Sequence, residues 1–241
     1  MASIQLALDW EKDDYGLEKN SCPSHLDSLI PDWIKTPLST GTTLLAAEYD
    51  GGVYIGADTR TSTGAYVAAR YSDKLTYITD QIYCCRSGSA ADTQAIAEIV
   101  KYHLSFYEME VGEPAPVKVA ANIFRDLCYQ YRDQLTAGII VAGWDKREKG
   151  QIYMVPLGGM LLRLPVAMGG SGSSYIVGHV DGTYKPKMSK EECRKFIIES
   201  ITHAINRDGS SGGCVRLANI SESGVEREDI EFNNLPRFQD I

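Results

Sequence analysis

Short runs of apolar residues, broken by turn-forming residues, open the larger part of the chain. The runs over 43–49 and 53–58 flank Asp50-Gly-Gly, and this arrangement predicts a β-hairpin. Two more runs, over 74–78 and 82–86, are separated by only three residues. The sequence therefore predicts a domain that begins with four short strands.

Apolar residues next recur every three or four positions, which is the spacing of an amphipathic α-helix. This pattern covers 91–104, after a serine-rich cap region, and 117–131. A third helix is expected to start after Ser189, because Glu192 completes a capping box with it, and to run to Ile205. Each of these helices has one apolar face, so each is expected to cover other elements.

Strand-like runs return between and after these helices. They cover 137–143, 151–155, 159–164, 213–218 and 225–230, and a short helix is expected over 173–180. Turns too short for parallel crossovers join successive strands, so antiparallel sheets are expected. The element order favours an α+β fold, in which two stacked antiparallel sheets with helix layers outside are one of several possible arrangements.

Residues 1–41 differ from the rest of the chain in composition and in the spacing of their apolar residues. They hold seven acidic residues, three lysines, no arginine and three of the nine prolines, and they show no sustained period of two or 3.6. This segment is interpreted as an extended leader that precedes the folded domain.

Composition narrows the classes of function. The chain has 241 residues, of which 44% are hydrophobic, and its formal net charge is −8, the wrong sign for a protein that tracks a phosphate backbone. Its longest apolar runs are strand-sized, far below the roughly 20 residues of a membrane span. A soluble protein is expected, with neither nucleic acid nor membrane as a partner.

Cysteine and histidine do not suggest a metal site or a bound cofactor. The cysteines stand at positions 22, 84, 85, 128, 193 and 214 without a CxxC pair, and the four histidines form no ligand-spaced cluster with them. We interpret the cysteines as reduced structural thiols, which indicates the cytoplasm or nucleus.

Two common catalytic motifs are absent. The string 169–173 fails the last position of a Gly-x-Ser-x-Gly nucleophile elbow. Neither 169–174 nor 208–213 continues into the Lys-Ser/Thr of a phosphate loop. The first string is expected to be a loop that enters a helix, and the second a helix exit.

The remaining Gly-, Ser- and Thr-rich strings form a constellation. They are Ser39-Thr-Gly-Thr-Thr43, Gly56-Ala-Asp-Thr-Arg-Thr-Ser-Thr-Gly64, Ser72-Asp-Lys74, Cys85-Arg-Ser-Gly-Ser-Ala-Ala-Asp92, Gly170-Ser-Gly-Ser173 and Arg207-Asp-Gly-Ser-Ser-Gly-Gly213. In this order and spacing, over about 42–230, they resemble the proteasome β-subunit family. Within that family they are most similar to the caspase-like, β1-type members.

The resemblance implies the N-terminal nucleophile (Ntn) hydrolase fold, a four-layer αββα sandwich, which agrees with the element order. It also implies that 1–41 is a propeptide, removed by autocatalytic cleavage between Gly41 and Thr42 to leave a catalytic domain over 42–241. A threonine hydroxyl needs a base, and a free α-amino group with a pKa of about 7.7–8.0 can serve near neutral pH. The uncut chain has an amide there, so the precursor is expected to be inactive. Gly41 fits because the peptide before the hydroxyl must bend sharply.

The resemblance further assigns catalytic roles by position. It implies Thr42 as nucleophile, Asp58 and Lys74 as a charged pair, Gly88 as the backbone N–H donor to the oxyanion, and Ser171, Asp208 and Ser211 as a supporting hydrogen-bond network. On the residues alone, Asp58 and Lys74 would be an ordinary surface pair, and the last three would be loop and cap residues. A buried Lys74 ammonium would favour the deprotonated hydroxyl.

The resemblance also implies a substrate-binding set. Arg86 corresponds to the pocket for the residue before the scissile bond, where a guanidinium can pair with an acidic side chain. Thr61, Thr63 and Ser72 match other pocket positions, and Ser62 and Ala90 would bind the substrate backbone in extended form. Without the resemblance, an arginine at a strand end is more often solvated.

Three functions are distinguished on this basis. The first is a threonine endopeptidase that cleaves unfolded, ubiquitin-targeted polypeptides after acidic residues, in a barrel of stacked heptameric rings of α and β subunits assembled with chaperones. The second is a non-catalytic ring subunit, against which the presence of Thr42, Asp58 and Lys74 weighs. The third is another Ntn amidohydrolase acting on a small molecule, which the string 86–92 disfavours.

Overall fold

The computed structural model describes residues 39–63 and 66–238. Most of the expected propeptide therefore lies outside the described residues, as does Cys22. The strands are β1 (Ser39–Thr40), β2 (Leu44–Tyr49), β3 (Gly52–Asp58), β4 (Thr61–Thr63), β5 (Tyr66–Ala69), β6 (Leu75–Thr79), β7 (Ile82–Ser89), β8 (Ala137–Asp145), β9 (Lys149–Val155), β10 (Leu162–Arg163), β11 (Val166–Gly169), β12 (Val215–Ser221) and β13 (Gly224–Ile230). The helices are α4 (Ala90–Val111), α5 (Val117–Gln130), α6 (Ser173–Thr183), α7 (Lys190–Arg207) and the 3₁₀ helix η2 (Phe232–Asn234).

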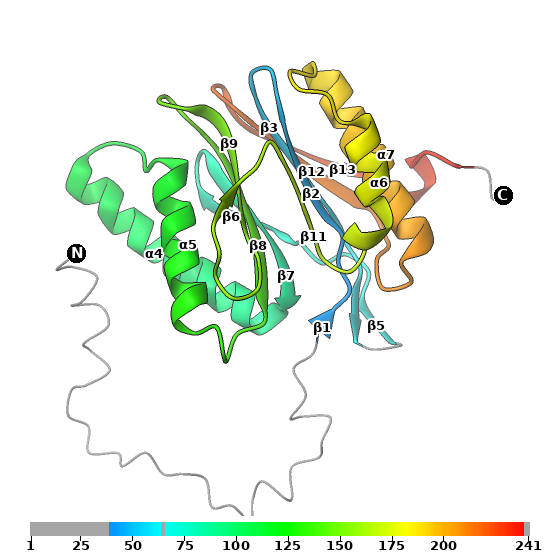
Figure 1. Ribbon diagram of the computed structural model, residues 1–241, viewed down its shortest axis with the longest axis horizontal. Coiled ribbons are helices and arrows are strands. Elements are labelled where there is room, and N and C mark those ends of the chain that lie inside the picture. Colours follow the sequence, from blue (N-terminus) through cyan, green and yellow to red (C-terminus); the bar gives the residue numbers. More distant parts are fainter. Residues whose placement is uncertain (1–38, 64–65, 239–241) are drawn as a thin grey trace, which may run out of the picture. The chain divides into compact units, whose positions relative to one another are not determined.

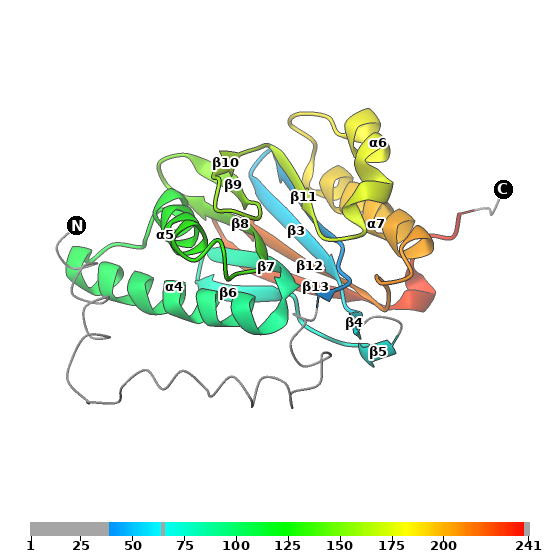
Figure 2. The same cartoon turned by 60° about the horizontal axis from the view of Figure 1, so that its bottom comes forward.

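The strands form two large antiparallel sheets. One has the order β1-β7-β8-β9-β10, with β6 also paired to β7, and the other has the order β11-β2-β3-β12-β13. Strands β4 and β5 form a separate two-stranded ribbon. Helices α4 and α5 cover the first sheet and α6 and α7 cover the second, as the two views show (Figures 1 and 2). The predicted four-layer αββα sandwich is confirmed.

Three apolar layers hold the sandwich together. Phe124 and Leu104 pack between α4, α5 and the first sheet, and Ile197 packs between α7 and the second sheet. The middle layer lies between the sheets. Consecutive residues Leu44 and Leu45 enter different layers, because successive side chains of a strand point to opposite faces. Both faces of β2 are therefore buried, which explains its continuous apolar run.

Turn and cap residues set the ends of several strands and helices where the sequence predicted them. The hairpin of β2 and β3 forms around the predicted turn, with Tyr49 opposite Gly52. Helix α7 starts after Ser189 with the predicted capping box, and Ser89 caps α4 by accepting the Asp92 N–H at 3.3 Å. Loops lead into α6 and out of α7 where the glycine-rich strings were placed.

Other elements differ from the expectation. Helix α4 is two turns longer than predicted, because its last turns carry exposed apolar residues such as Phe106 and Met109 and so lack the one-sided pattern. The predicted strand over 159–164 shortens to β10, and β11 follows it. The ribbon β4–β5 was not predicted, since every residue of β5 is exposed and no alternation marks it.

The described part contains five free cysteines, all buried, in agreement with the reduced structural thiols expected for them. Within residues 39–63 and 66–238, no three or more His, Cys, Asp or Glu side chains are placed to hold a metal ion. None of the helices described combines the length and apolar character needed to cross a membrane.

Candidate active site

The segment around residue 42 connects the first sheet to the second. Strand β1 pairs with the end of β7, with Thr40 opposite Gly88, and β2 begins two residues after Thr42. Thr42 is only 1% exposed. Its N–H donates to Ser171 Oγ at 3.1 Å, and its carbonyl accepts the Gly172 N–H at 3.1 Å. These contacts fix the backbone on both sides of the Thr42 side chain.

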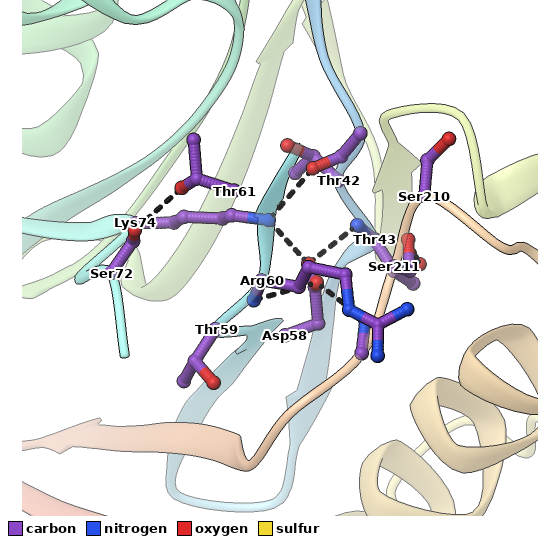
Figure 3. A network of polar contacts seen from close by, with 12 residues as sticks. Thr42, Thr43, Asp58, Thr59, Arg60, Thr61, Ser72, Lys74, Ser210 and Ser211 are labelled. Carbon is purple, nitrogen blue, oxygen red and sulfur yellow. Dashed lines mark hydrogen bonds and ion pairs between the residues drawn. The ribbon is translucent and has the colours of Figure 1, made fainter. Parts of the chain in front are cut away.

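A buried ion pair lies beside this segment. Lys74 Nζ is 2.6 Å from Asp58 Oδ1 and donates to the Gly41 carbonyl at 3.0 Å (Figure 3). Asp58 is completely buried and Lys74 is 7% exposed. Burial lowers the pKa of Lys74, and the neighbouring Asp58 carboxylate opposes that shift. The resemblance-based pairing of Asp58 with Lys74 therefore corresponds to direct contact, at the bond between residues 41 and 42.

Backbone donors complete the environment of Asp58. Its Oδ1 also accepts the Thr43 N–H at 2.9 Å, and its Oδ2 accepts the N–H groups of Arg60 at 3.2 Å and Gly212 at 3.0 Å. Together with Lys74, these donors satisfy the hydrogen-bonding capacity of the buried carboxylate. Asp58 therefore keeps Lys74 in place and joins β3 to the loop after α7.

A second network supports the Thr42 nitrogen. The hydroxyls of Ser171 and Ser211 both donate to Asp208 Oδ2 at 2.7 Å, and Ser211 Oγ accepts from Thr43 Oγ1 at 2.8 Å. Although burial opposes it, hydrogen bonding from the Ser211 and Ser171 hydroxyls lowers the pKa of Asp208. The three predicted network residues are thus brought together, and Ser171 connects them to Thr42.

At two positions of the site, neighbouring atoms lie too close to the backbone for any residue other than glycine. A Cβ on Gly41 would lie 2.0 Å from the Ser210 Cβ, and one on Gly88, which has a φ of 106°, would lie 2.2 Å from the Thr136 carbonyl oxygen. Gly41 itself does not have a positive φ. Its requirement for glycine therefore comes from Ser210, in addition to any bend in the peptide.

Arg86 lies on the α4 side of β7 and is held by hydrogen bonds. Its Nε donates to Thr76 Oγ1 at 2.7 Å, its Nη1 to Thr93 Oγ1 at 3.3 Å, and its Nη2 to the Asp73 carbonyl at 3.5 Å. Among the described residues, no carboxylate forms an ion pair with this guanidinium. The charge of Arg86 is therefore fixed in position without an internal counter-ion.

The other predicted substrate-binding residues fall into two groups. Thr61 and Ser72 share a hydrogen bond between their hydroxyls, and Ser62 Oγ accepts the Gly41 N–H at 3.2 Å. Thr63 is half-buried on β4, and Ala90 is exposed as the first residue of α4. The Ala90 carbonyl accepts from Thr93 Oγ1 at 3.3 Å, the same hydroxyl that accepts from Arg86, so Ala90 lies close to the Arg86 guanidinium.

Sequence reasoning missed the residues that brace this site. Arg60 donates to the Gly209 carbonyl at 3.0 Å and fills the space against Gly212, so it supports the loop that carries Asp208 and Ser211. Thr76 and Thr93 were missed as partners of Arg86. Arg60 lies inside the string 56–64 that carries the family resemblance, so it could have been singled out, whereas no sequence signal indicated the two threonines.

Comparison with known proteins places this arrangement in a family. The family model described as "Proteasome subunit" matches residues 38–220. Proteasome subunit beta type-6 of Dictyostelium discoideum is 53% identical over 208 residues, which cover 86% of this chain and 97% of that protein. Proteasome subunit beta type-1 of Saccharomyces cerevisiae is 52% identical over 193 residues, covering 80% of this chain and 89% of that protein. Proteasome subunit beta type-9 of Oncorhynchus mykiss is 49% identical over 214 residues, covering 89% and 98%. This chain therefore belongs to the proteasome β-subunit family.

Proposed function

We propose that this chain is a catalytic, β1-type subunit of the 20S proteasome core, a threonine endopeptidase that cuts unfolded polypeptides after acidic residues. The observation that carries the proposal is the position of Lys74, whose ammonium contacts both the Asp58 carboxylate and the Gly41 carbonyl. A cation at the carbonyl that precedes a buried threonine is placed to stabilise negative charge on that oxygen.

Activation would begin with cleavage between Gly41 and Thr42. The Thr42 hydroxyl attacks the adjacent Gly41 carbonyl carbon, and Lys74 donates to the oxygen as it becomes an oxyanion. The C–N bond breaks, an ester to Thr42 Oγ forms, and the hydroxyl proton ends on the Thr42 nitrogen. Water then hydrolyses the ester, which releases the Gly41 carboxyl group and restores the hydroxyl. Residues 1–41 thus act as a propeptide and 42–241 as the catalytic domain.

The mature site would use the new α-amino group as base. In the present structure the Thr42 nitrogen is already within 3.1 Å of Ser171 Oγ, which Asp208 and Ser211 hold in place. The amine takes the hydroxyl proton as Thr42 Oγ attacks a substrate carbonyl, and the Gly88 N–H receives the resulting oxyanion. Lys74 favours both the deprotonated hydroxyl and the neutral amine.

Specificity would come from Arg86. Its guanidinium is restrained by Thr76 and Thr93, yet it has no ion-pair partner among the residues described, so an incoming carboxylate can pair with it. Thr61 and Ser72, which share a hydrogen bond, are proposed as further pocket residues. Ser62 accepts the N–H of Gly41 and is proposed to bind a substrate backbone in the same way. Thr63 and Ala90 remain predicted substrate contacts.

The two alternative functions fit these contacts less well. A non-catalytic ring subunit has no use for a buried Asp58–Lys74 pair that is costly to desolvate and is directed at residue 41. An amidohydrolase for small molecules does not need a strand edge that binds an extended peptide. In this chain the end of β7 does bind an extended segment, since β1 pairs with it at Gly88.

Partners and location follow from the same proposal. The names of the relatives, all proteasome β-type subunits, support assembly with other α and β subunits in a barrel of stacked heptameric rings. We include assembly chaperones as transient partners, and the cytoplasm and nucleus as the compartments.

The acid preference is tested by Arg86→Leu. Removing the guanidinium should lower kcat/KM for substrates with Glu before the scissile bond by about 10–100-fold, since a buried carboxylate loses its partner. The same change should raise kcat/KM for Leu substrates. The measurement uses fluorogenic peptides on assembled particles in which the other active subunits are inactivated. Arg132→Leu, at an exposed arginine in the turn after α5, is the control and should change neither value. Unchanged selectivity in Arg86→Leu would withdraw the β1-type assignment.

Cleavage at residue 41 is tested by Gly41→Ala. The added Cβ would collide with Ser210, so the scissile carbonyl must leave Lys74 and self-cleavage should slow by about 10-fold or more. Gly209→Ala is the matched control, because a Cβ there meets nothing within 4 Å. Pulse-chase analysis of propeptide loss gives both rates. Equal rates in the two variants would show that the position of the Gly41 carbonyl does not limit cleavage.

A further inference from the structure

Asp73 and Lys74 are neighbours in the chain, and each forms an ion pair with the second sheet. Lys74 contacts Asp58 at the end of β3. The Asp73 carboxylate accepts from Arg227 Nη2 at 2.7 Å and lies 3.7 Å from Arg216 Nη1. Both arginines belong to the hairpin of β12 and β13. The function proposed so far gives these side-chain contacts of Asp73 no role.

The two arginines lie on the face of the second sheet that is turned toward the first. Ala218 of β12 packs in the layer between the sheets. Arg216 stands two positions before Ala218, and Arg227 is the register partner of Ala218 on β13, so both share its face. The Arg216 side chain is only 17% exposed, and its Nε donates to Asp229 Oδ2 at 3.1 Å. The Arg216 guanidinium is therefore restrained between two carboxylates, of which Asp73 is one.

The register of β12 places this ion-pair cluster beside the Asp58–Lys74 pair. Strand β12 also pairs with β3, with Arg216 opposite Ala57, the residue before Asp58. Two consecutive residues, Asp73 and Lys74, are thus tied to two neighbouring strands of one sheet. This double attachment leaves the segment little freedom to rotate.

Asp73 also restrains the backbone around Lys74. Its Oδ1 accepts the Leu75 N–H at 3.0 Å, which closes a turn with Lys74 at its centre. The Asp73 carbonyl accepts from Arg86 Nη2 at 3.5 Å, and the Lys74 carbonyl accepts the Arg86 N–H at 3.2 Å. A rotation of Asp73 would therefore displace both the backbone that carries the Lys74 ammonium and an acceptor of the Arg86 guanidinium.

We propose that Asp73 is a positioning residue for both Lys74 and Arg86. Its side chain is anchored by the two arginines of the β12–β13 hairpin, and its backbone sets where the two cationic groups lie. The inference rests on the proposed peptidase function and extends it to a residue that acts through two others. Ion pairs between partly exposed side chains add little to folding stability, so the cluster is expected to act mainly on the geometry of the site.

Asp73→Asn tests this role, because it keeps an oxygen for the Leu75 N–H and removes the charge that attracts the two arginines. In assembled particles with the other active subunits inactivated, kcat/KM is measured for fluorogenic peptides with Glu or Leu before the scissile bond. The ratio of the Glu value to the Leu value should fall about 10-fold, since small displacements of a binding group are costly. If Asp73 acted only through its charge, the ratio would rise instead, because a carboxylate near Arg86 disfavours an acidic substrate.

Self-cleavage of the precursor provides a second readout, because it depends on Lys74 and involves no acidic substrate side chain. Pulse-chase analysis of propeptide loss should give a rate about 10-fold lower in Asp73→Asn. Arg227→Gln removes an anchor and should lower both the ratio and the self-cleavage rate, whereas Arg227→Lys keeps a cation for Asp73 and should retain both. If Asp73→Asn does not enter particles, these two Arg227 variants decide the matter by the same readouts.

Arg194→Gln is the matched control. It breaks the ion pair of Arg194 with Glu228, which also joins β13 to another element and involves an arginine about as exposed as Arg227. Both the ratio and the self-cleavage rate should stay at the unmodified values.

The outcomes separate this inference from the proposed function. An unchanged or higher ratio in Asp73→Asn, or an unchanged rate of self-cleavage, would overturn the positioning role. The peptidase proposal would then stand, provided that unmodified particles cleave the Glu peptide at this subunit. If unmodified particles neither remove the propeptide nor cleave that peptide, both proposals fail.

Discussion

The Thr42→Ala chain is expected to fold and to enter the ring, but to keep its propeptide and to show no peptidase activity. The hydroxyl serves both reactions, so its loss should reduce turnover of Glu substrates by at least about 10⁴-fold, the scale seen when a hydrolase loses its nucleophile. The backbone contacts of Thr42 with Ser171 and Gly172 do not depend on its side chain. Alanine therefore removes the chemistry with little effect on packing.

Thr42→Ser provides the matched control, because it keeps a hydroxyl at the same position and should retain both cleavage and turnover. Propeptide loss is followed by mass spectrometry of the chain isolated from particles, in cells whose other active β subunits are inactivated. Processing of Thr42→Ala at the normal position under these conditions would show that another protease makes the cut.

Lys74→Arg is expected to lower both self-cleavage and turnover by about 10²–10³-fold, although it conserves the charge. The Lys74 ammonium lies 2.6 Å from Asp58 and 3.0 Å from the Gly41 carbonyl in a space that is almost closed to solvent. A planar guanidinium is larger and cannot take the place of an ammonium between these two oxygens. Lys74→Ala should be at least as inactive, and it also leaves the buried Asp58 charge without its cation.

Lys101→Arg makes the same exchange at an exposed position of α4 and should behave like the unmodified chain. Comparing single-turnover cleavage of the precursor with steady-state hydrolysis of a Glu substrate separates the two reactions. Near-normal rates for Lys74→Arg in both assays would mean that Lys74 serves only as a structural partner of Asp58.

The sequence predicted most of the fold because its signals are local. The hairpin around Asp50, the capping box at Ser189 and the apolar faces of α5 and α7 depend on residues close together in the chain. Strands β4 and β5 were not predicted, because every residue of β5 is exposed and its sequence therefore does not alternate between apolar and polar residues. A strand is recognised in a sequence mainly by the apolar residues it buries, and less by the intrinsic β-propensity of its residues.

The site was predictable only in part, for a related reason. Asp58 and Lys74 are ordinary residues until the fold buries them against Gly41, so the family resemblance, not their spacing, singled them out. The clash that requires glycine at 41 involves Ser210, from the far end of the chain. A contact over such a separation depends on tertiary packing that no local pattern records. Arg86 is held by residues 7 to 13 positions away, but on a neighbouring strand, loop and helix whose packing also had to be known.

The most direct test of this account is the N-terminus of the chain in assembled, active particles. Intact-mass and N-terminal peptide spectrometry should find a chain that starts at Thr42 with a free α-amino group, because only that species has both the nucleophile and its base. A chain in active particles that still carries residues before Thr42, or whose Thr42 nitrogen is blocked while Glu substrates are cleaved at this subunit, would contradict the account.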